Sequence, residues 1–126
     1  MKKVIQTSGA PAAIGPYSQA IVHNGIAYLS GQIPLDPATG QLVEGGMEEQ
    51  TVRVLENLGA VLAACGSSYA QVLKTTIFVK DLGDFAKVNE IYGRYFPVDP
   101  PARATVEAAR LPRDVRVEIE AIAAVD

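Results

Sequence analysis

One arginine and two glutamates in the last third of the chain have the residue types and the spacing to act together. Polar and apolar side chains largely alternate along residues 102–108 and along residues 115–123, which predicts two β-strands. Alternate residues of a strand lie on one face, so Glu118 and Glu120 share a face of the second strand. If the two strands form a hairpin, Arg103 meets both carboxylates on the face of the sheet that is turned away from the helices.

This predicted cluster has two interpretations. In the first, Arg103 forms a cross-strand ion pair with Glu120, which stabilises an exposed strand pair by no more than about 1 kcal/mol. In the second, the Arg103 guanidinium binds a substrate carboxylate through two parallel hydrogen bonds. Glu118, opposite Thr105 in the hairpin, then positions a water molecule or transfers a proton. The alternation of residue types does not decide between the two.

Three further polar side chains are candidates for binding a small molecule. Tyr17 follows a Gly-Pro pair and is predicted on a rigid turn rather than in a core strand. Ser30 ends a predicted strand, and Asn89 lies at the edge of the apolar stripe of a predicted helix. Each also has an ordinary structural explanation: a tyrosine at the rim of the core, a strand-end hydroxyl, and an asparagine that hydrogen-bonds a loop.

The composition argues against several function classes. The chain has 11 Lys and Arg against 14 Asp and Glu, a net charge of −3, and an isoelectric point of about 5.1. This balance does not favour binding to a nucleic-acid backbone. With one cysteine and one histidine, neither a disulfide framework nor a zinc site is expected, and we expect no metal. Cys65 is predicted to be a structural thiol, and His23 to lie at the surface beside an Asn-Gly turn.

The length of 126 residues suits a single domain over residues 1–126. No apolar run approaches the roughly 20 residues of a membrane span. Residues 1–7 are basic but lack the apolar stretch of a signal peptide. We therefore expect a cytoplasmic protein that has no membrane partner.

Apolar periodicity and turn residues predict the elements that must position the candidate side chains. The predicted strands are 4–7, 20–23, 26–30, 73–80, 102–108 and 115–123, and the predicted helices are 47–65 and 84–96. This order predicts an α+β fold with one mixed β-sheet of about six strands and two long helices on one face. The other face would expose apolar side chains, which predicts a homo-oligomer that covers it.

Several segments together resemble one protein family. They are Gly15-Pro16-Tyr17-Ser18-Gln19, Leu29-Ser30-Gly31-Gln32, Phe78-Val79-Lys80-Asp81-Leu82, residues 84–92, Pro101-Ala102-Arg103-Ala104-Thr105-Val106, Leu111-Pro112 and residues 117–123. On these motifs the chain resembles the reactive intermediate deaminases of the RidA or YjgF type, which are also described as endoribonuclease L-PSP proteins. The resemblance covers essentially the whole length, and its C-terminal motifs are the most specific.

The resemblance implies a chorismate-mutase-like fold that assembles as a trimeric barrel with clefts between neighbouring subunits. It implies hydrolysis of 2-enamino and 2-imino acids, such as 2-aminoacrylate and 2-iminopropanoate, to 2-keto acids and ammonia without a cofactor. Arg103 matches the carboxylate-binding arginine, and Glu118 matches the glutamate associated with the attacking water. Tyr17, Ser30 and Asn89 match further residues of the substrate site. Thr105 stands where the active class usually has cysteine, and activity is expected to survive because the implied role runs through main-chain groups.

Two other functions are kept as alternatives. Some relatives are described as endoribonucleases or translation inhibitors, against which the acidic balance and the single histidine count. Family members without the arginine are expected to be non-enzymatic metabolite-binding or chaperone-like modules. Because Arg103 is present, the deaminase is the leading hypothesis.

Overall fold

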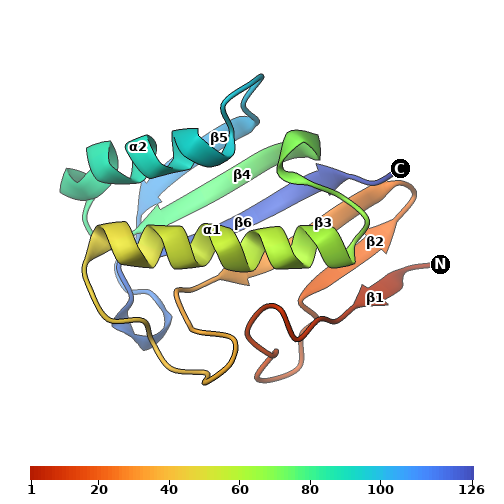
Figure 1. Cartoon of the computed structure of the whole chain (residues 1–126), viewed down its shortest axis with the longest axis horizontal. Helices are drawn as coiled ribbons and strands as arrows, with labels where there is room; N and C mark the ends of the chain where they lie inside the picture. The colour runs from red at the N-terminus through yellow and green to blue at the C-terminus, as the bar shows by residue number, and fades with distance from the viewer.

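The computed structural model describes all 126 residues and consists of one six-stranded sheet with two helices on one face (Figure 1). The strands are β1 (Lys3–Ile5), β2 (Ala20–His23), β3 (Ile26–Gln32), β4 (Val72–Val79), β5 (Ala102–Glu107) and β6 (Val117–Ala124). The helices are α1 (Met47–Ala64) and α2 (Phe85–Tyr95). The predicted α+β class, the mixed sheet and the two helices on one face are confirmed. Neither helix is long and apolar enough to cross a bilayer.

The turn between β2 and β3 forms as predicted. Asn24 and Gly25 both have positive φ angles, 51° and 76°, as a two-residue hairpin turn requires. Farther along β3 the register against β6 shifts between Leu29 and Gln32. The shift is a bulge that includes Gly31. At this bulge the backbone of β3 lies against the Glu118 side chain of β6.

Helix α1 packs its apolar stripe on the sheet. Leu55, Leu58 and Leu62 are fully buried, as their three- and four-residue spacing predicts. The first turn is closed by the Glu49 carboxylate, which accepts a hydrogen bond from the Gly46 amide at 2.8 Å. The helix thus covers β6 and β3 on this face of the sheet.

The predicted hairpin between the last two strands is wrong. The strand order is β1-β2-β3-β6-β4-β5, so β4 lies between β5 and β6. Helix α2 carries the chain from the end of β4 back to its start, and β5 therefore pairs with β4 in parallel. The connection from β5 to β6 then passes over the end of β4, where the Ala108 amide donates to the Val79 carbonyl at 2.9 Å and the Lys80 amide donates to the Arg116 carbonyl at 2.9 Å.

The sheet face opposite the helices is partly apolar and uncovered in the single chain. Tyr28 on β3 is a register partner of Ile122 on β6, and their side chains are 49% and 36% exposed. On the neighbouring strands Val106 is 43% exposed and pairs with Phe78. An apolar surface of this extent on one face of a sheet is typical of a contact with another molecule.

Candidate functional site

Arg103 lies on the helix side of the sheet. Its Cα partner in β4 is Thr75, whose side chain is buried under α2, so Arg103 points toward the same helix. Its Nη1 donates a hydrogen bond to Oδ1 of Asn89 at 2.6 Å. The guanidinium carbon lies 5.3 Å from the ring centre of Phe85 and 5.0 Å from that of Tyr92. Arg103 is exposed and forms none of the ion pairs of the chain.

The next two residues on this face of β5 are Thr105 and Glu107. The Oγ1 atom of Thr105 is inaccessible to solvent and has no hydrogen-bond partner in the chain. The Glu107 carboxylate accepts a hydrogen bond from the Leu82 amide at 3.0 Å and so ties the end of β5 to the turn before α2. A buried hydroxyl without a partner is uncommon, and it lies one strand repeat from Arg103.

Glu118 lies on the opposite face of the sheet. It is half-buried, and its carboxylate packs against Gly31 in the bulge of β3. Burial raises the pKa of Glu118 above its usual range, and the neighbouring charge of Glu120 raises it further. A carboxyl group of this kind is better suited to exchange a proton near neutral pH than an ordinary surface glutamate.

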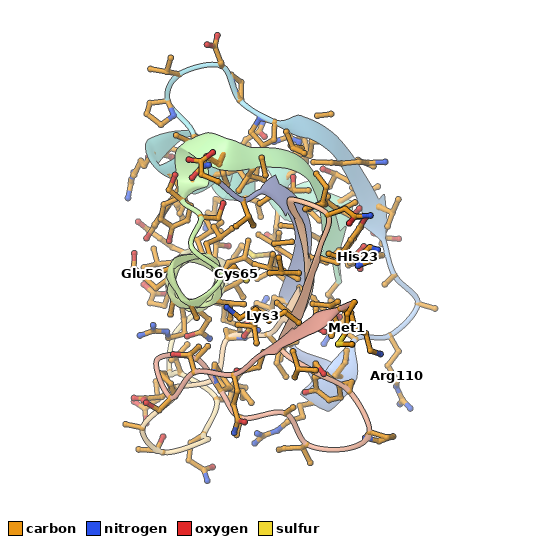
Figure 2. The ribbon with its side chains drawn as sticks, turned by 90° about the vertical axis from the view of Figure 1, so that its right-hand side faces the viewer. Met1, Lys3, His23, Glu56, Cys65 and Arg110 are labelled. Carbon is orange, nitrogen blue, oxygen red and sulfur yellow. The ribbon has the colours of Figure 1, made fainter.

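Tyr17 and Ser30 line a groove next to this bulge, together with Pro16, Ser18 and Tyr28. The Ser30 hydroxyl donates to the Ser18 carbonyl at 2.6 Å, which joins the end of β3 to the loop that carries Tyr17. Tyr17 itself is 53% exposed. Both side chains therefore belong with Glu118 to the open face of the sheet. In Figure 2 this face is on the right, where His23 is labelled.

The loop that carries Tyr17 is organised by Gln19, which sequence reasoning missed. Its carboxamide is almost fully buried and accepts from the Thr7 amide at 2.7 Å. It also donates to the Thr7 carbonyl at 3.1 Å and the Pro11 carbonyl at 2.9 Å. The only signal in the sequence is a polar residue placed between a Gly-Pro turn and an apolar strand.

The structure thus separates the predicted site into two groups of residues. Arg103, Asn89 and Thr105 lie between β5 and α2, and Glu118, Tyr17 and Ser30 lie on the open face. The predicted meeting of Arg103 with Glu118 and Glu120 on one face is wrong, because β4 separates their strands and their side chains point to opposite faces. Within one chain no site contains both Arg103 and Glu118.

Cys65 and His23 belong to neither group of candidate residues. Cys65 is buried at the end of α1, and burial raises the pKa of its thiol. His23 is exposed at the end of β2, on the other side of the sheet from α1 in Figure 2. The structure contains no group of three or more His, Cys, Asp or Glu side chains arranged to hold a metal ion.

Comparison with known proteins finds close relatives over the whole chain. A family model described as Endoribonuclease L-PSP matches residues 7–125. The 2-iminobutanoate/2-iminopropanoate deaminase of Mus musculus is 54% identical over 123 residues, which cover 98% of this chain and 91% of that protein. RutC family protein PH0854 of Pyrococcus horikoshii is also 54% identical, over 98% of both chains. The crystal structure of YyfA, a Rid family protein from Yersinia pestis, has a TM-score of 0.97 at 52% identity and covers 99% of this chain and 100% of its own.

Gly31→Ala is expected to displace the Glu118 carboxylate and to lower its pKa toward that of an ordinary glutamate. A Cβ at position 31 would overlap Oε2 of Glu118 and lie 3.0 Å from its Cδ, so the flexible carboxylate must move. The measurement is the pH titration of the Glu118 side-chain carbon by NMR in both proteins. Gly93→Ala is the control, because nothing lies within 4 Å of a Cβ there. An unchanged Glu118 titration in Gly31→Ala would contradict the assigned packing.

Proposed function

The chain belongs to the endoribonuclease L-PSP family, the RidA/YjgF-type proteins, and we propose that it is a deaminase that hydrolyses reactive 2-enamino and 2-imino acids to 2-keto acids and ammonia. The observation that carries this proposal is the state of Arg103. Its guanidinium is exposed and oriented by Asn89 and two aromatic rings, and no carboxylate of the chain neutralises it. A fixed guanidinium without an acidic partner is well suited to bind a small carboxylate.

In the proposed reaction Arg103 binds the carboxylate of the 2-imino acid and orients its C2 atom. An enamine substrate first takes up a proton at C3 and becomes the iminium ion, which is the protonated form of the imine. Water then adds its oxygen to C2, and Glu118 accepts a proton from that water. Glu118 returns this proton to the nitrogen, and the C2–N bond breaks as the C2 hydroxyl releases its own proton to solvent and becomes the carbonyl group. Ammonia then leaves together with the 2-keto acid. Imine hydrolysis already proceeds in water, so orientation and proton transfer are sufficient help.

The proposed site is formed between two copies of the chain. Arg103 and Glu118 lie on opposite faces of one sheet, so a single substrate contacts both only if they come from different subunits. The uncovered apolar face around Tyr28 and Ile122 supports the same assembly, because a second copy would bury it. We propose a homotrimer, in which Tyr17, Ser30 and Glu118 of one subunit face Asn89, Arg103 and Thr105 of the next.

The family description also names an endoribonuclease, which is the second candidate. The net charge of −3 does not favour a phosphate backbone. The single histidine lies exposed on the β2–β3 hairpin, apart from Arg103. RNA is therefore tested as a second substrate beside 2-aminoacrylate.

Wild-type protein is expected to accelerate the decay of 2-aminoacrylate, generated in situ from serine by a dehydratase, and the appearance of pyruvate. Arg103→Ala is expected to remove the acceleration, because it removes the group that binds the carboxylate. Arg94→Ala is the control, since Arg94 lies on α2 and pairs with Glu90 at 3.2 Å. Full activity in Arg103→Ala would reject the proposed role. RNA cleavage that requires Arg103, without effect on 2-aminoacrylate, would favour the endoribonuclease.

Glu118→Gln is expected to lower kcat by roughly 10²- to 10⁴-fold, the usual effect of losing an acid–base group. In the wild type, kcat should fall as the pH is lowered through the pKa of Glu118, since only the ionised carboxylate accepts a proton. That pKa is raised, so the loss should begin at a higher pH than for an ordinary glutamate. The variant should lack this acid limb in a pH–rate profile. An identical acid limb in both proteins would show that another group titrates.

Subunits of Arg103→Ala and Glu118→Gln are expected to regain activity when they are unfolded, mixed in equal amounts and refolded together. In a mixed assembly some interfaces receive the intact Arg103 of one chain and the intact Glu118 of the other. Random assembly of a ring restores about one quarter of the sites. The measurement is pyruvate formation by the mixture compared with each variant refolded alone. If the mixture is no more active than its components, the site does not form between chains.

A further inference from the structure

Tyr92 and Thr75 form a buried pair directly beneath Arg103. The Tyr92 hydroxyl and the Thr75 hydroxyl are 2.7 Å apart, at hydrogen-bond distance. Tyr92 is 4% exposed and Thr75 is 1% exposed, so neither side chain is accessible to a substrate. The proposed hydrolysis gives them no direct role, although Tyr92 belongs to the hydrophobic core cluster.

The sheet register explains why this pair contacts the arginine. Thr75 and Arg103 are Cα partners in the parallel pair β4–β5, so both side chains rise toward α2 side by side. Tyr92 descends from α2 onto both: its hydroxyl meets Thr75, and its ring lies 5.0 Å from the Arg103 guanidinium carbon. The hydroxyl contact therefore fixes the orientation of the ring that the guanidinium packs against.

Helix α2 completes the support with two more residues at regular spacing. Phe85, Asn89 and Tyr92 are four and three residues apart, which places them on one face of the helix. Phe85 contacts the guanidinium from one side at 5.3 Å, and Asn89 accepts its hydrogen bond at 2.6 Å. Of the five N–H groups of the arginine, only one is used by Asn89, which leaves the others for a carboxylate.

We propose that Tyr92, held by Thr75, is a positioning residue that fixes the Arg103 guanidinium in the orientation that binds a carboxylate. The identity of the ligand rests on the proposed deaminase function, whereas the orientation of Arg103 does not. An arginine side chain has several rotatable bonds, and a side chain that is ordered before binding loses less entropy when the ligand arrives. The aromatic face supplies attraction to the cation without neutralising it.

The first test measures binding of pyruvate, a stable 2-keto acid, and of its neutral analogue pyruvamide by calorimetric titration. Tyr92→Leu is expected to weaken pyruvate binding about three- to thirtyfold, the range of a cation–π contact. Binding of pyruvamide, which has no carboxylate, is expected to change little. A role in core packing alone would weaken both ligands equally, and that result would overturn the proposal.

Tyr95→Leu is the matched control for this substitution. Tyr95 lies three residues farther along α2, and its hydroxyl donates to Oε2 of Glu56 at 2.8 Å rather than contacting Arg103. The Tyr95→Leu substitution removes a similar ring from the same helix. It should leave the preference for pyruvate over pyruvamide at the wild-type value. Loss of the preference in Tyr95→Leu as well would assign the effect to helix packing and would overturn the proposal.

Two milder substitutions keep the test decisive if Tyr92→Leu does not fold. Tyr92→Phe keeps the ring and removes its hydroxyl, and Thr75→Val removes the partner hydroxyl at nearly constant volume. Each frees the ring to move, so each should reduce the pyruvate preference by a smaller factor, about two- to fivefold. If both variants keep the wild-type preference, the Tyr92–Thr75 contact does not position Arg103.

A second readout separates this proposal from the proposed function. The Arg103 Nε–H signal in an NMR spectrum should be shifted by the two rings in the wild type, and it should move toward the value of a free arginine in Tyr92→Leu or Thr75→Val. Wild-type protein that neither turns over 2-aminoacrylate nor binds pyruvate, but shows this shift, would reject the deaminase and keep the positioning role. A signal that is the same in the wild type and the variants would reject the positioning role, whatever the activity.

Discussion

The parallel pairing of β5 with β4 is the constraint on which the candidate site depends. Because α2 returns the chain to the start of β4, β5 has to lie at the sheet edge and in parallel, and β6 enters on the other side of β4. This order brings the Arg103 side chain under α2 and places Glu118 on the opposite face. A simple hairpin of β5 and β6 would have put both on one face.

Two features of the single chain would both be explained by the proposed homotrimer. The open face of the sheet carries exposed Tyr28 and Ile122, and the candidate residues are divided between its two sides. A second copy that covers the apolar face would also bring a second set of side chains to Glu118. In such an arrangement association buries apolar surface and completes the site at the same time, so a dissociated chain would be both less stable and inactive.

Local features were predictable from the sequence, and long-range pairing was not. The helix predicted over 47–65 forms over Met47–Ala64. Arg103 and Thr105 lie on one face of their strand and Ala104 on the other, as the alternation of residue types predicts. The strand order failed because a short connection favours a hairpin, whereas here the connection crosses over the end of β4. The support of Arg103 was also missed. The spacing of Phe85, Asn89 and Tyr92 predicts a shared helix face, but only the register shows which strand residue lies under it.

The side chains that orient Arg103 are uncharged, and this suits the carboxylate ligand that is proposed for it. Arg94 and Lys80 pair with Glu90 and Asp114 at the surface, at 3.2 Å and 3.0 Å. A carboxylate beside Arg103 would orient it equally well, but it would occupy the N–H groups that a substrate carboxylate needs. Two rings and a neutral amide orient the guanidinium and leave its charge available. Neutral support is therefore the arrangement expected for an arginine whose anionic partner comes from outside the chain.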